Sequence, residues 1–192
     1  FNAWFLNKGY LELDIEYRTS DSLNWEIHVE QMQKESRAPL YKHKVPTDIY
    51  FNDTIIRKEL WLDKQTQVFD LSFPRKAKFV KFDAENSLLC KKTENRSKED
   101  YLFILQNVVN YKDQNEAIMY LEKSLNKKSL IPAYMSLLDS PYYYFRNLAL
   151  KIIPLKKNAP YYPAYMKKVR EMADKDSDPL VRKTAKAVLE KE

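Results

Sequence analysis

Apolar and polar residues alternate strictly along the first half of the chain. Residues 11–18 read Leu-Glu-Leu-Asp-Ile-Glu-Tyr-Arg, and residues 25–30 read Trp-Glu-Ile-His-Val-Glu. Because successive side chains of a strand point to opposite faces, this period of two predicts half-buried antiparallel strands.

Further strands are expected beyond the first two. They are predicted at residues 45–51, 55–62, 67–73, 78–84 and 87–91. Polar segments rich in turn-forming residues separate several of them, at 19–22, 52–54 and 63–65. Short strands at this regular spacing predict an N-terminal antiparallel β-sandwich over residues 10–95.

After residue 95 the apolar residues follow a helical period. Ser97 and Asp100 form a capping-box-like start. The helix that follows is expected to bury Leu102, Ile104, Leu105, Val108 and Val109. Further helices are expected at residues 113–126, 129–139, 142–155, 161–175 and 178–191. The sequence therefore predicts a multi-domain fold, all-β and then all-α.

Two segments of the helical half match each other at an offset of 36 residues. Arg146 and Arg182 are 36 residues apart, as are Ala149 and Ala185, and each segment is preceded by an aspartate, Asp139 or Asp178. A fixed offset of this size is typical of stacked helical hairpins. The aspartates are expected to cap helix starts, and the alanines to lie where helices approach closely. In HEAT-like repeats an arginine at this place bonds the preceding aspartate. An α-α superhelix of HEAT-like hairpins is therefore expected over residues 96–192.

Composition excludes several classes of site. The chain has 192 residues, of which 44% are hydrophobic, enough to bury a core. Its single glycine, Gly9, excludes Gly-rich phosphate-binding loops. Its single cysteine, Cys90, excludes an internal disulfide and a cysteine-based zinc site.

The net charge of +6 is unevenly distributed. Residues 1–96 hold 16 basic and 15 acidic residues, whereas residues 97–192 hold 17 and 12. Basic runs at 42–44 and 75–78 could meet nucleic acid, but acidic residues are interspersed, which favours a solvated surface. No apolar run is long enough to span a bilayer. We therefore expect neither nucleic acid nor a membrane as a partner.

The two histidines lie outside any catalytic or metal motif. His28 stands between Glu26 and Glu30, a pattern that could touch a metal but that favours a solvated strand face. His43 stands between lysines, which would repel a cation. We therefore expect no catalytic residue and no metal ligand in this chain.

Two tyrosine clusters fall near expected turns between helices, at residues 142–145 and 161–165. Such rings can stack against a peptide or against bases. They can also fill the gap between hairpins, which is the favoured interpretation, with one or two rings left exposed. Candidate surface contacts, with a catalytic domain or with peptide, are Phe1, Trp4, Phe5, Tyr142, Tyr143 and Tyr162.

Several short segments resemble the C-terminal region of aminopeptidase N-like zinc metallopeptidases, most closely the bacterial branch. They are FNAWFLNKGYLEL at 1–13, DIY at 48–50, WLDK at 61–64, FP at 73–74, VKFD at 80–83 and LLCK at 88–91. One position departs from the pattern, because Leu11 stands where the family usually has proline.

This resemblance implies a domain order and a role. Residues 1–9 would be the tail of a missing catalytic domain and a linker, followed by a β-sandwich over 10–95 and a HEAT-like helical domain over 96–192. The family's zinc chemistry needs H-E-x-x-H and a further glutamate. This motif and the Gly-x-Met-Glu-Asn strand are absent. The resemblance therefore implies a non-catalytic spacer and lid over the catalytic cleft.

The partners implied by the resemblance are the N-terminal catalytic domain of the same chain and the peptide substrate. The implied cofactor is zinc, held in the parent enzyme and not in this part. The alternative is a stand-alone HEAT-like protein-interaction module, and a basic nucleic-acid binder is the weakest reading. The aromatic segment with Phe1, Trp4 and Phe5 favours the first hypothesis, because a free adaptor has no reason to begin with a truncated aromatic helix.

Overall fold

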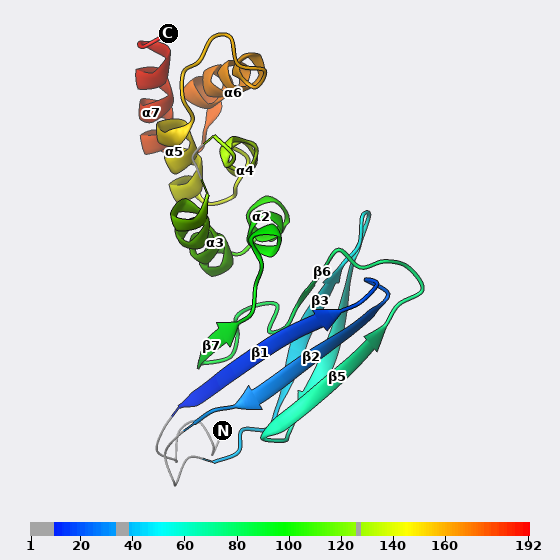
Figure 1. Cartoon of the computed structure of the whole chain (residues 1–192). Helices are drawn as coiled ribbons and strands as arrows, with labels where there is room; N and C mark the ends of the chain where they lie inside the picture. The colour runs from blue at the N-terminus through cyan, green and yellow to red at the C-terminus, as the bar shows by residue number, and fades with distance from the viewer. Residues whose placement is uncertain (1–9, 34–38, 126–127) are drawn as a thin grey trace. The chain divides into compact units, whose positions relative to one another are not determined.

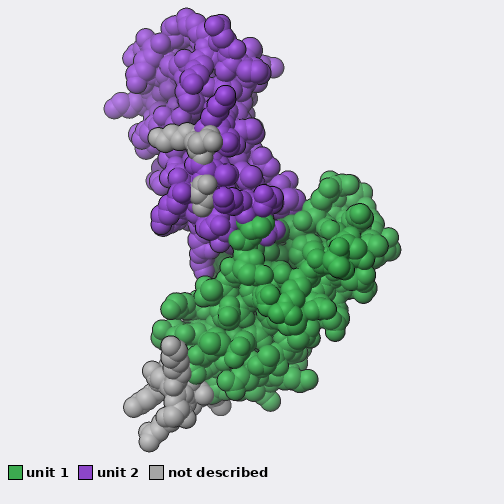
Figure 2. Space-filling view, viewed as in Figure 1, with its two compact units in different colours: residues 1–97 green, residues 98–192 purple. Residues whose placement is uncertain are grey.

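The computed structural model describes residues 10–33, 39–125 and 128–192. The chain divides into two compact units, Phe1–Ser97 and Lys98–Glu192 (Figure 2). Every described strand lies in the first unit and every described helix in the second (Figure 1). The fold is therefore mixed, with β and α structure separated along the chain. The expectations for residues 1–9, including Phe1, Trp4 and Phe5, lie outside the described residues.

The first unit contains two open sheets. Its strands are β1 (Leu11–Thr19), β2 (Asn24–Gln31), β3 (His43–Tyr50), β4 (Ile55–Leu62), β5 (Thr66–Ser72), β6 (Phe79–Lys81) and β7 (Cys90–Glu94). One sheet has the order β5-β2-β1-β7 and the other β4-β3-β6. The first five strands follow the predicted positions closely, whereas β6 is shorter than the predicted 78–84 and β7 begins later than the predicted 87–91.

One pairing corrects the expectation of a purely antiparallel arrangement. Strand β7 runs parallel to β1, with Leu11 opposite Cys90 and Ile15 opposite Glu94. Neighbouring antiparallel strands need only a tight turn, whereas a parallel pair needs a longer crossover. Here the chain leaves β6, which belongs to the other sheet, before it reaches the free edge of β1.

Both sheets bury side chains in one hydrophobic core. Strand β1 contributes Leu11, Leu13 and Ile15, each at most 2% exposed. Strand β2 contributes alternate residues from Trp25 to Val29, and β3 contributes Val45 and Ile49. The apolar residues of each alternating strand therefore lie on the inner face of the sheet, because burial there removes these side chains from water.

The second unit contains helices that pack as neighbouring pairs. They are α2 (Lys98–Asn107), α3 (Tyr111–Ser124), α4 (Ile131–Leu137), α5 (Tyr143–Ile152), α6 (Tyr162–Lys175) and α7 (Pro179–Leu189). Helix α2 packs on α3 and on α4, and α7 packs on α6 and on α5. Proline lies in the first turn of α4, α6 and α7, where its missing N–H leaves no bond unmade.

Val109 was expected in the core of the first helix and is instead 68% exposed. Helix α2 ends at Asn107, so Val109 lies in the short connection to α3. The next helix begins at once, because the Asn110 side chain accepts bonds from the N–H groups of Lys112 and Asp113. Because the chain leaves the helix before Val109, this side chain does not lie on the buried helical face that its spacing in the sequence predicted.

The repeat offset of 36 recurs in the hydrogen bonds of the two arginines. The Nη1 group of Arg146 donates to the carbonyls of Ser140, at 2.8 Å, and Pro141, at 3.1 Å. The Nη1 group of Arg182 donates to the carbonyls of Asp176 and Ser177, at the same sequence separations. Ala149 and Ala185 are both fully buried. Each arginine therefore stabilises, through these hydrogen bonds, the turn that precedes its own helix.

The aspartates of the repeat do not occupy equivalent positions. Asp178 caps α7 by accepting from the N–H groups of Leu180 and Val181. Asp139 caps no helix, because α5 begins only at Tyr143, and its carboxylate lies 2.5 Å from Lys168 Nζ. The expected capping role of Asp139 is wrong.

Ser140 and Asp176 are the equivalent pair instead. The Ser140 hydroxyl accepts from the N–H of Tyr142, and the Asp176 carboxylate accepts from the N–H of Asp178. Asp176 is also the acidic partner of Arg146, in place of the expected Asp139. The guanidinium Nε and Nη2 atoms lie 2.8 and 2.7 Å from its two oxygens. Side-chain exposure is 11% for Arg146 and 6% for Asp176, so this ion pair is nearly buried.

Asp176 should make the helical unit sensitive to acid. Burial alone would raise the pKa of this carboxyl, but hydrogen bonds from Arg146 and from the Asp178 N–H outweigh it and lower the pKa. The folded pKa therefore lies below the unfolded value of about 3.9. The stabilisation is complete above that value and is lost as the pH falls through the folded pKa.

Asp176→Asn provides the comparison for this pH effect. We expect the melting temperature of the wild-type chain to exceed that of Asp176→Asn at pH 6, and the gap to narrow below about pH 4. Far-UV circular dichroism reports the helices, while all three tryptophans lie in residues 1–97 and report the first unit. A gap that stays constant from pH 6 to pH 2 would contradict this linkage.

Candidate functional site

A pocket of about 330 Å³ opens where the starts of three helices meet. Its lining residues are Tyr111, Pro141, Tyr142, Tyr143, Tyr144, Arg146, Ser177 and Asp178. They come from the first turns of α3 and α5 and from the connections that precede α5 and α7. We call this the tyrosine pocket.

Phe145 forms the buried base on which three tyrosine rings pack. Its side chain is fully buried. The ring centroids of Tyr111, Tyr142 and Tyr144 lie 5.0, 5.9 and 5.3 Å from that of Phe145. Tyr111 also meets Tyr142 edge-on at 5.5 Å. Tilted and edge-to-face contacts of this kind are favourable, so the rings hold one another in place.

Two of these three rings, Tyr111 and Tyr144, remain open to solvent, and so does their neighbour Tyr143. Tyr111 is 44%, Tyr143 51% and Tyr144 43% exposed. Single exposed apolar residues are normal on protein surfaces, whereas several large aromatic side chains gathered around one pocket indicate a binding site. The pocket therefore offers fixed aromatic surface that a ligand can cover.

The second tyrosine cluster is a packing element. Tyr162, expected as a surface contact, is buried, and its hydroxyl lies 3.3 Å from Glu192 Oε1. Tyr165 is fully buried and donates to the Leu150 carbonyl, and burial raises its pKa to about 12. Of the two clusters, only residues 142–144 line the pocket.

The charged groups at the tyrosine pocket differ in how they are paired. Arg146 is held by the bidentate bond to Asp176. Asp178 uses Oδ1 to cap α7, and no described basic side chain lies within ion-pair distance of its carboxylate. The pocket thus combines electron-rich ring faces with one carboxylate that makes no ion pair with a basic side chain of the described residues.

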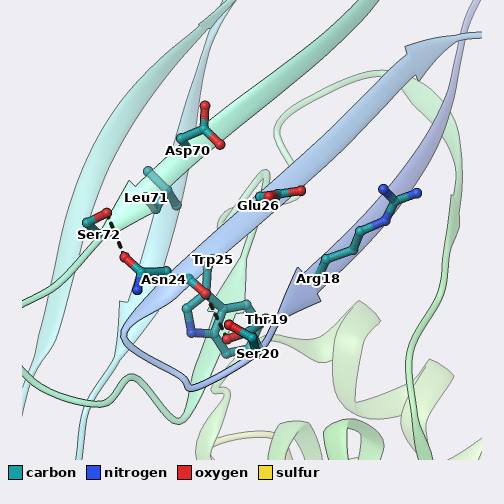
Figure 3. A pocket seen from close by; sticks show the side chains of 9 residues that line it. All are labelled: Arg18, Thr19, Ser20, Asn24, Trp25, Glu26, Asp70, Leu71 and Ser72. Atoms are coloured by element: carbon teal, nitrogen blue, oxygen red, sulfur yellow. Dashed lines mark hydrogen bonds between the residues drawn. The ribbon is translucent and has the colours of Figure 1, made fainter.

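A second pocket, of about 460 Å³, lies at the end of the β1–β2 hairpin (Figure 3). Its lining residues are Arg18, Thr19, Ser20, Asn24, Trp25, Glu26, Asp70, Leu71 and Ser72. The Thr19 hydroxyl donates to the Asn24 carbonyl, and the Ser72 hydroxyl donates to Asn24 Oδ1. These bonds close the hairpin and tie it to β5, so they have a structural use already.

The described residues contain neither a cluster of metal ligands nor a membrane-spanning helix. No group of three His, Cys, Asp or Glu side chains within them is placed to hold a metal ion. His28 Nε2 lies 2.7 Å from Glu26 Oε2, a local contact on one strand. The described residues therefore do not provide a zinc site. None of the described helices has the length and apolar content to cross a bilayer.

Sequence reasoning identified Tyr142 and Tyr143 but missed three residues of this region. Tyr111 enters the pocket from the preceding hairpin, and Asn110 before it was the available signal of a helix start. Tyr144 belonged to the cluster but was not singled out. Asp176 could have been found by applying the 36-residue offset to Ser140.

Comparison with known proteins gives a fold likeness. No family model matches the sequence, and no curated protein is detectably similar to it. Among solved structures, aminopeptidase A of Legionella pneumophila, in complex with aspartic acid, matches with a TM-score of 0.54 and 12% identity. The match covers 95% of this chain and 21% of that chain, so this chain spans a small part of that enzyme's length. The fold described here therefore also occurs as part of a larger aminopeptidase.

Proposed function

We propose that this chain is a non-catalytic part of a zinc aminopeptidase. The observation that carries the proposal is the fold likeness to part of an aminopeptidase over 95% of the chain. The sequence segments that resemble the C-terminal region of aminopeptidase N-like enzymes support the same proposal. In this proposal the first unit is a β-sandwich spacer, and the helical unit is a HEAT-like lid over the cleft.

The residues of the chain support a binding role more than a chemical one. The repeated bracing of helix turns by Arg146 and Arg182 is consistent with HEAT-like hairpins. The tyrosine pocket supplies exposed rings that can contact a peptide. Zinc and its H-E-x-x-H motif would belong to a catalytic domain that this chain lacks.

The proposal implies a longer protein that contains this chain, and the test compares the two. Residues 1–192 should release no dye from aminoacyl-coumarin substrates and should retain no stoichiometric zinc after dialysis. The longer protein should carry H-E-x-x-H upstream, hydrolyse these substrates and lose activity to a chelator. Activity in residues 1–192, or an upstream reading frame without this motif, would overturn the proposal.

The second candidate is a stand-alone protein-interaction module, and the exposed tyrosine pocket favours it. It differs in one measurable respect, because a module would bind its partner without any adjoining peptidase. An upstream region without H-E-x-x-H, together with specific capture of a protein by residues 1–192, would select this candidate.

A further inference from the structure

We propose that the tyrosine pocket binds a lysine or arginine side chain of an extended peptide segment. This inference rests on the proposed function in one respect, that the occupant is a peptide. It adds the side-chain chemistry that the pocket selects.

The ring arrangement favours a cation. An aromatic ring carries negative charge on its faces, and a cation within about 6 Å of a ring centroid is attracted to it. Tyr111 and Tyr144 come from different helices, and their ring centroids lie 6.0 Å apart. Each side chain is a little under half exposed. A long basic side chain can lay its methylene groups along these rings and keep its charge over them.

The charge of the pocket selects the same class of occupant. The Arg146 charge is already satisfied by both oxygens of Asp176. Arg182, in α7, directs its Nη1 to the carbonyls of Asp176 and Ser177. The Asp178 carboxylate remains as the acceptor for an incoming cation. An acidic side chain would meet this carboxylate and the ring faces, both of which repel it.

The size of the pocket limits the occupant to one side chain. Its volume of about 330 Å³ lies at the low end of the roughly 300–1,000 Å³ typical of small-molecule sites. A whole peptide does not fit, whereas a single long side chain does. Tyr143, 51% exposed at the rim, is left to contact the neighbouring residues of the segment.

Fluorescence polarisation of labelled peptides on the 1–192 chain tests this inference. The peptides share one Gly/Ser/Ala background with blocked ends and differ only at a central Lys, Arg, Gln or Glu. Blocking removes the terminal charges, so only the central side chain varies. We expect the Lys and Arg peptides to bind about 5-fold more tightly than the Gln peptide, and the Glu peptide most weakly.

Two variants connect this preference to the pocket. Asp178→Asn removes the charge but keeps a good helix-capping residue, so it should reduce the Lys-over-Gln preference several-fold at unchanged melting temperature. Tyr144→Leu keeps apolar contact with Phe145 and should also reduce the preference. Asp174→Asn makes the same charge change on α6, outside the pocket, and should have little effect.

Equal affinity for the four peptides, absence of binding, or equal effects of Asp178→Asn and Asp174→Asn would overturn the inference. Hydrolysis is not part of this measurement, so the two proposals can fail separately. Lysine-selective binding with an inactive longer protein would reject only the aminopeptidase proposal. An active longer protein without side-chain preference at this pocket would reject only the cation site.

Discussion

Replacing Arg146 with alanine should destabilise the helical unit by about 3 kcal/mol, the lower end of the cost of breaking a buried ion pair. The substitution leaves the Asp176 carboxylate without its bidentate partner at 6% side-chain exposure. It also removes the bonds to the Ser140 and Pro141 carbonyls. This loss of stability should exceed that caused by Arg182→Ala, which removes hydrogen bonds to carbonyls but leaves no buried carboxylate without its partner.

Urea unfolding followed by far-UV circular dichroism measures this loss, and tryptophan fluorescence checks that the first unit is unaffected. Arg146→Lys should recover little, because an ammonium cannot make the planar two-bond contact. The double variant Arg146→Met with Asp176→Leu should recover most of the stability, since no unpaired charge remains. Equal losses for Arg146→Ala and Arg182→Ala would show that the ion pair is not the dominant contribution.

Replacing Asp83 with alanine should destabilise the first unit by about 3–5 kcal/mol. Asp83 is fully buried, and its Oδ1 accepts from the N–H groups of Ser87 and Leu88. Its Oδ2 lies 3.0 Å from Nζ of Lys92, whose side chain is only 8% exposed. Although burial alone would lower the pKa of Lys92, Asp83 and Glu94 outweigh it and raise that pKa, so the lysine stays charged.

The backbone adds to this cost. Asp83 has a φ of 51°, a left-handed conformation that aspartate and asparagine tolerate better than alanine. Asp83→Asn should therefore lose less than Asp83→Ala, because it keeps an acceptor for the turn while removing the charge.

Tryptophan fluorescence during urea unfolding reports this unit through Trp25, which is 8% exposed. Asp53→Ala, which removes an exposed ion pair to Arg75, is the matched control and should change stability little. A loss for Asp83→Ala no larger than for this control would refute the assigned role.

The sequence by itself determined which segments become strands and which become helices. Alternation placed Leu11, Leu13 and Ile15 on the inner face, because a strand repeats every two residues whatever it packs against. The 36-residue offset likewise predicted that Arg146 and Arg182 occupy equivalent places in the repeat, and their carbonyl bonds share the same separations, although neither makes the expected bond to the side chain of its preceding aspartate. Those bonds are local, so the order of residues along the chain is enough to specify them.

Only the tertiary structure decided the contacts between distant residues. The parallel pairing of β7 with β1, the choice of Asp176 over Asp139 for Arg146, and the entry of Tyr111 into the tyrosine pocket all depend on which segments pack side by side. Arg146 and Asp176 are 30 residues apart, and no local period relates them. Periodicity fixes the face that a residue occupies within its own element, whereas a partner is fixed by the stacking of whole elements, which depends on their lengths and turns.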